Sequence, residues 1–145
     1  MKRLAGLRFK PGMAPIALAA VILLALQGLH GIDHLTLQDR PLEPQIAALG
    51  VLESAAVLLT LVLALRGRPE AAPAAFFAGG FTALAFAASN LLDRWGFLSD
   101  PYAEQSLGAV SWVVMFAGLV AALALAGTGI AALRSGAGKR VVADW

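Results

Sequence analysis

Both histidines of the chain, His30 and His34, lie four residues apart at the end of a long apolar run. In a helix, residues three and four positions apart share a face, so Gln27, His30, Asp33 and His34 are expected within one wedge of the helix surface. Imidazole and carboxyl groups can bind metal ions, carry protons and form hydrogen bonds. Because ionisable groups are costly at membrane depth, this polar face is the first candidate for a functional site.

The residue types on this face, together with two more distant acids, suggest a metal site. The candidate ligands are two imidazoles and two carboxylates: His30, His34, Glu53 and Asp93. Three further polar residues are candidates for hydrogen bonds that orient those ligands: Gln27, Asp33 and Asn90. Histidine combined with carboxylate suits a divalent transition metal, namely Zn, Fe, Mn or Cu.

The composition is that of a membrane protein. Of the 145 residues, 59% are hydrophobic and only 14% are charged, whereas a soluble domain averages about half apolar and a quarter charged residues. Cysteine is absent, which excludes disulfides and thiolate metal ligands. The sequence pI is near 9.5, but the basic residues stand at the ends of apolar segments. That placement indicates membrane orientation, and it argues against nucleic-acid binding.

Four apolar segments are expected to be transmembrane helices, at about residues 13–34, 45–65, 74–93 and 108–133. About 20 helical residues cross a hydrocarbon core of roughly 30 Å, so each segment is long enough. The predicted fold is an all-α integral membrane protein, a single domain over residues 1–145 with its helices in an up-down bundle. Two basic tails, 1–12 and 134–145, flank it.

Two of these segments carry small residues at every fourth position, a spacing that lets membrane helices approach closely. The two stripes are Gly79, Ala83 and Ala87 in the third segment and Gly118, Ala122 and Ala126 in the fourth. Three aromatic residues between the third and fourth segments are expected in the lipid headgroup layer: Trp95, Phe97 and Tyr102.

The distribution of basic residues predicts the orientation. Nine of the eleven Lys and Arg residues fall in the N-terminal tail, the connection at 66–73 and the C-terminal tail. Only Arg40 and Arg94 fall in the other two connections. Basic residues concentrate on the cytoplasmic side, so both termini are expected in the cytoplasm and the chain in a cell inner membrane as a multi-pass protein.

This orientation brings the candidate residues to one level. The first and third segments run outward, which places His30, His34, Asn90 and Asp93 near the outer surface. Glu53 lies about two turns below the same surface on the second segment, at 1.5 Å per residue. The sequence therefore predicts an outward-facing pocket of histidine and carboxylate groups that binds a divalent metal ion or a small polar ligand.

Two other functions stay open at this point. A structural or assembly subunit of a larger membrane complex, or a homo-oligomer, needs no ligand, because Glu53 could act as a protonated acid that bonds a neighbouring helix. A proton-coupled small transporter would use His30 and Glu53 as relay groups. The apolar inner halves of the helices argue against a continuous pore. Whether the chain is an enzyme is not decided by the sequence; metal-assisted chemistry would be the expected class.

Overall fold

The computed structural model describes residues 12–38, 43–92 and 96–136, and it folds them into helices. The elements are α1 (Met13–Thr36), α2 (Pro44–Leu65), α3 (Ala71–Asn90), the short 3-10 helix η1 (Tyr102–Glu104) and α4 (Ala109–Arg134). Each of the four α-helices is long and apolar enough to cross a membrane. The all-helical architecture with four candidate membrane spans is therefore confirmed.

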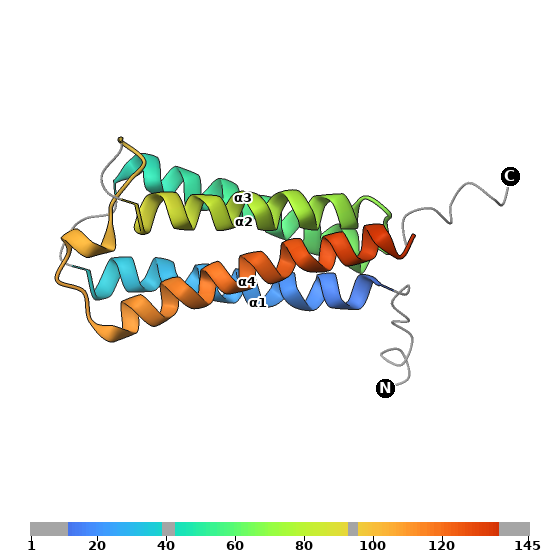
Figure 1. Ribbon diagram of the computed structural model, residues 1–145, viewed down its shortest axis with the longest axis horizontal. Coiled ribbons are helices and arrows are strands. Elements are labelled where there is room, and N and C mark those ends of the chain that lie inside the picture. Colours follow the sequence, from blue (N-terminus) through green and yellow to red (C-terminus); the bar gives the residue numbers. More distant parts are fainter. Residues whose placement is uncertain (1–11, 39–42, 93–95, 137–145) are drawn as a thin grey trace, which may run out of the picture.

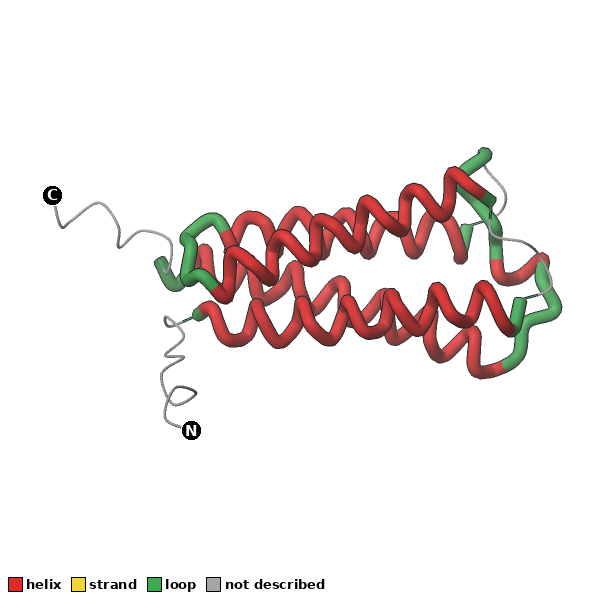
Figure 2. Tube along the Cα trace, turned by 180° about the vertical axis from the view of Figure 1, so that it is seen from behind, coloured by secondary structure: helices red, strands yellow, loops and turns green. Residues whose placement is uncertain are grey.

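The four helices form an elongated bundle (Figure 1). The start of α1 and the end of α4 lie at one end, and the α1–α2 and α3–α4 connections lie at the other. Seen from behind, α1 and α4 form one layer and α2 and α3 the other (Figure 2). Sequence neighbours contact each other and α1 contacts α4, whereas α1 and α3 face each other across the diagonal with little contact.

Glycine and proline mark the starts of the helices. Gly12 precedes α1 with a φ of 87°, a left-handed conformation that favours glycine. Pro44 is the first residue of α2. Helix α3 begins at Ala71, three residues before the sequence-based estimate, and so includes Pro73 in its first turn. Proline is tolerated there because the N–H groups of a first turn have no partner within the helix.

The outer surface of the bundle is strongly apolar. Large aliphatic side chains that are more than half exposed occur on every helix, among them Leu18, Leu59, Leu84 and Leu123. A contiguous apolar surface of this extent is unfavourable in water and favourable in hydrocarbon. The exposed surface, like the helix lengths, is that of a multi-pass membrane protein.

Helices α3 and α4 approach until their backbones touch. A Cβ atom built on Gly79 would lie 2.5 Å from the backbone nitrogen of Ala126 and 2.6 Å from the carbonyl oxygen of Ala122. One built on Gly129 would lie 2.6 Å from the backbone nitrogen of Phe76. The two small-residue stripes meet at Gly79, which faces Ala122 and Ala126, whereas Gly118 faces the ring of Phe86 and Ala87 is only half-buried. Small residues at this interface allow the close packing that holds membrane helices together.

Helix α2 packs much less closely than α3 and α4. Its buried residues are Glu53, Val57, Thr60 and Ala64, so none of its first nine residues is buried. The first half of α2 is therefore at most partly buried against the bundle. The space beneath this half contains the candidate functional site.

Candidate functional site

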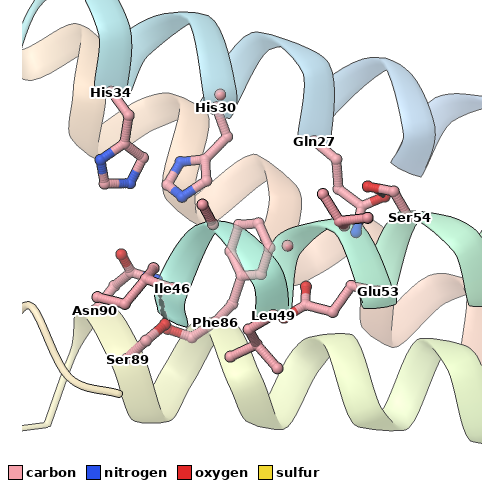
Figure 3. A pocket seen from close by; sticks show the side chains of 14 residues that line it. Gln27, His30, His34, Ile46, Leu49, Glu53, Ser54, Phe86, Ser89 and Asn90 are labelled. Carbon is pink, nitrogen blue, oxygen red and sulfur yellow. Dashed lines mark hydrogen bonds between the residues drawn. The ribbon is translucent and has the colours of Figure 1, made fainter. Parts of the chain in front are cut away.

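A partly open pocket of about 390 Å³ lies between α1, α2 and α3 (Figure 3). Its polar lining residues are Gln27, His30, His34, Glu53, Ser54, Ser89 and Asn90. Apolar side chains, including Ile46, Leu49, Val51 and Phe86, form the remaining wall. A largely apolar pocket with a few polar groups, at this volume, is typical of small-molecule sites.

The two histidines belong to the wall that α1 contributes. Their rings point from α1 into the pocket (Figure 3) and meet edge to face, with centroids 4.7 Å apart. The ring of His30 also packs on Phe86 of α3, with centroids 4.8 Å apart and planes inclined by 37°. The four-residue spacing thus places both imidazoles on one face, as the sequence predicts.

Tyr102 of η1 is hydrogen-bonded to His30. The Nε2 group of Gln38 donates to the hydroxyl oxygen of Tyr102 at 3.1 Å and to a carboxylate oxygen of Asp33 at 2.9 Å. The Tyr102 hydroxyl lies 3.2 Å from His30 Nδ1. Because its oxygen accepts from Gln38, its proton is free to bond Nδ1. We infer that the hydroxyl donates to Nδ1, which leaves the proton of His30 on Nε2, the nitrogen on the pocket side.

The prediction that Tyr102 is an aromatic anchor exposed to lipid headgroups is wrong. The side chain has no exposed surface, and it packs against the rings of His30 and Trp112. Burial, assisted by the nearby negative charge of Asp33, raises the pKa of Tyr102 above its ordinary value, so the phenol keeps its proton. Phe97, by contrast, is 73% exposed, and Trp95 lies outside the described residues.

The connection before α4 folds back over the bundle and carries Tyr102 inward. The backbone N–H of Asp100 donates to the carbonyl of Ser89 at 2.8 Å, which ties this connection to the end of α3. Pro101 is fully buried next to Tyr102. The Asp100–Pro101 pair marks a turn in the sequence, but only the tertiary contact shows that this turn directs a phenol to a histidine.

Asp33 does not line the pocket, although the spacing places it on the histidine wedge. Its carboxylate accepts hydrogen bonds from Ser111 of α4 at 2.7 Å and from Gln38. At 100° per residue, Asp33 lies roughly 120° around the helix from Gln27, which directs it towards α4. A chain of hydrogen bonds through Gln38 and Tyr102 links Asp33 to His30. Ser111 is therefore a structural partner of a buried acid, a role that its sequence position alone does not reveal.

Glu53 is the acid of the pocket, and it is only 4% exposed. Its carboxyl group interacts with the side chain of Gln27 on α1. Gln27 Nε2 is itself buried, and within the described residues it finds no acceptor at full hydrogen-bond geometry. The Gln27 carbonyl oxygen accepts a 3.4 Å hydrogen bond from Ser54. The carboxyl group of Glu53 is thus weakly satisfied for a buried acid.

Asn90 contributes an acceptor from α3. Its Nδ2 group donates to the backbone carbonyl of Phe86 at 3.0 Å and to Ser89 Oγ at 2.9 Å. With the amide protons used in this way, the side-chain oxygen of Asn90 is turned towards His34 across the pocket (Figure 3). Asn90 therefore belongs to the pocket as the sequence suggests, at its histidine end.

The structure does not assemble a metal centre from the described residues. No three His, Cys, Asp or Glu side chains among residues 12–38, 43–92 and 96–136 lie close enough to hold one ion. His30, His34 and Glu53 line the same pocket, but the fourth candidate ligand, Asp93, lies outside the described residues. A Zn, Fe, Mn or Cu site that includes Asp93 stays a prediction.

Comparison with protein-family models, with curated proteins and with solved structures finds no match to this chain. We therefore infer the function from the geometry of the pocket.

Replacing Tyr102 by phenylalanine should allow the proton of neutral His30 to occupy either ring nitrogen. In the native protein we expect ¹⁵N NMR of the imidazoles, at neutral pH in lipid nanodiscs, to show His30 protonated on Nε2. Tyr102→Phe should give a mixture of tautomers and a loss of about 1–3 kcal/mol of stability, because Gln38 and His30 Nδ1 lose a buried partner. The His34→Gln variant assigns the signals. A native His30 protonated on Nδ1 would contradict the proposed hydrogen-bond order.

Proposed function

We propose that this protein binds a small amphipathic molecule in the pocket between α1, α2 and α3. The observation that carries the proposal is the partly open volume of about 390 Å³, whose polar groups come from three helices and whose remaining wall is apolar. A molecule with an apolar body would displace loosely held water or lipid from this wall. Its polar atoms would meet His30, Asn90 and Glu53.

Small residues of α1 and α2 form part of the pocket wall. Gly31 on α1 and Gly50 on α2 both line the pocket, and a Cβ atom on either would meet nothing within 4 Å. Ala47 is the third small residue of this wall. The thin wall between α1 and α2 supports entry of a ligand from the side of the bundle.

We further propose that the helices span an inner membrane as an up-down bundle with both termini in the cytoplasm. The concentration of nine of the eleven Lys and Arg residues in the tails and the 66–73 connection supports this orientation. The pocket would then face the extracytoplasmic half of the bilayer. Its ligand would be taken from that half of the membrane or from the solution next to it.

Filling the pocket tests this proposal. Gly50 lines the pocket and is itself exposed, and a Cβ atom there meets nothing within 4 Å. We expect Gly50→Leu to narrow the pocket at this wall without displacing a helix. In phosphatidylcholine nanodiscs, saturation-transfer NMR should detect benzyl alcohol bound to the native protein. We expect that signal to fall to the level of empty nanodiscs in Gly50→Leu.

The matched control is Gly127→Leu on α4. Gly127 is exposed, a Cβ atom there also meets open space, and the residue does not line the pocket. This variant should bind benzyl alcohol as the native protein does. Equal loss in both variants, or no specific signal from the native protein, would overturn the proposed function.

A further inference from the structure

We propose that the ligand of this pocket is an organic cation, an ammonium ion attached to an apolar body, and that Glu53 is its counter-ion. This inference rests on the proposed function, because it names the class of molecule that the same pocket takes. The observation that supports this inference is that a buried acid, Glu53, an aromatic ring, Phe86, and aliphatic side chains line the same pocket.

The first step of the argument is charge. Glu53 is a buried acid that faces the pocket, and its interaction partner, Gln27, is neutral. None of the described residues that line the pocket is Lys or Arg, and its two histidines, His30 and His34, lie at the other end of the pocket from Glu53 (Figure 3). A buried carboxyl group is costly to ionise unless a cation lies beside it. A cationic ligand would favour the ionised form of Glu53 and pair with it.

The second step is the surroundings of the acid. In the close view the ring of Phe86 lies between the Glu53 end and the histidine end of the pocket (Figure 3). Aromatic faces attract ammonium ions through their quadrupole, and they also pack against apolar groups. Leu49 and Val51 extend this apolar wall on α2. The pocket therefore offers a counter-ion together with a surface for hydrocarbon.

The third step separates an organic cation from a metal ion. The described residues provide no group of three metal-ligating side chains, and a volume of about 390 Å³ is far larger than one ion needs. Metal sites present several oxygen or nitrogen ligands at about 2.0–2.6 Å from one point. A single carboxylate beside an apolar wall instead matches a monovalent cation that carries its own hydrocarbon.

The test compares a cation with a smaller neutral molecule that shares its benzyl group. Benzyltrimethylammonium and benzyl alcohol are titrated by equilibrium dialysis against the protein in phosphatidylcholine nanodiscs, with empty nanodiscs as the reference. We expect Glu53→Gln to raise the Kd of benzyltrimethylammonium by about tenfold or more, because the substitution removes one partner of a buried charge pair. The Kd of benzyl alcohol should not change.

Two further variants keep this test decisive. Glu53→Asp keeps the carboxyl group, so it should still bind benzyltrimethylammonium more tightly than Glu53→Gln does. Unchanged binding of benzyl alcohol by Glu53→Gln would show that this variant is folded. Glu70→Gln removes an exposed acid that pairs with Arg68, away from the pocket, and should leave both affinities unchanged.

The outcomes separate the two proposals. Cation binding that survives Glu53→Gln, or equal weakening of both probes, would overturn the organic-cation inference while the pocket remains a site for small amphipathic molecules. If the native protein bound neither probe above the level of empty nanodiscs, the proposed function itself would be wrong.

Discussion

Replacing Gly79 by alanine should destabilise the protein by about 1–3 kcal/mol, the usual cost of overpacking a close contact. The added Cβ atom would overlap the backbone of α4, at 2.5 Å from Ala126 N and 2.6 Å from Ala122 O. Backbone atoms cannot rotate away as a flexible side chain can, so α3 and α4 must separate. Because these two helices form the closest contact of the bundle, the effect should be large. The free energy of unfolding in mild detergent measures it.

Gly80→Ala is the matched control on the same helix. A Cβ atom on Gly80 meets nothing within 4 Å, so this variant should be as stable as the native protein or more stable by up to about 1 kcal/mol, from helix propensity alone. Gly129→Ala should behave like Gly79→Ala, because its Cβ atom would overlap the backbone of α3 at Phe76. Equal stability of Gly79→Ala and Gly80→Ala would show that α3 and α4 are farther apart than described.

The second large effect is expected at Asp33. Asp33→Ala should lower the free energy of unfolding by about 3 kcal/mol or more, because two hydrogen bonds to a charged group are lost and each contributes about 1.5–3 kcal/mol. Ser111 Oγ, in a side chain that is 1% exposed, would be left without its acceptor. Gln38 would also lose one of its two acceptors, which loosens its bond to Tyr102.

A double-mutant cycle isolates the contact between α1 and α4. Asp33→Ala, Ser111→Ala and the double variant should give a coupling energy of about 0.5–3 kcal/mol, since the two side chains are in direct contact. Thr128→Ala serves as the control for Ser111→Ala. Thr128 is also on α4, and its hydroxyl donates to the carbonyl of Leu125 in the same helix. Additive effects of Asp33→Ala and Ser111→Ala would contradict the contact.

The amino-acid sequence predicts the helices well because apolar length decides them. The chain has four runs of about 20 apolar residues and lacks the alternating pattern of membrane strands. Membrane-spanning helices are therefore the expected structure. Individual ends differ by a few residues. The largest difference is at α3, where Pro73 suggests a boundary but fits within the first turn.

The site is predictable where helical spacing decides it. His30, His34 and Gln27 share a pocket-facing side of α1, and the depth of Glu53 brings it to the same volume. The direction of Asp33 is not predictable from spacing alone, because it depends on which neighbouring helix lies 120° around α1. The burial of Tyr102 depends on the fold of a connection, and that fold is fixed by long-range contacts such as Asp100 to Ser89.

The arrangement of polar groups also bears on the alternatives. Below Glu53, the buried polar side chains of the spans are Thr60 and Thr82 within the described residues, and Thr60 bonds its own helix. A pocket at one end of the bundle is suited to binding more than to conduction. The roles of a structural subunit and of a proton-coupled transporter stay predictions that this arrangement does not require.

Protection of a thiol in the pocket tests the central claim most directly. The sequence contains no cysteine, so Gly50→Cys and Gly127→Cys each introduce a single thiol. The first lies at the pocket wall and the second at an exposed position of α4 that does not line the pocket. The rate of modification by a benzyl methanethiosulfonate reagent is measured in nanodiscs with and without benzyl alcohol. Binding in the pocket predicts that benzyl alcohol slows modification of Gly50→Cys and leaves the rate of Gly127→Cys unchanged. Equal rates with and without benzyl alcohol at both positions would contradict a ligand-binding pocket between α1, α2 and α3.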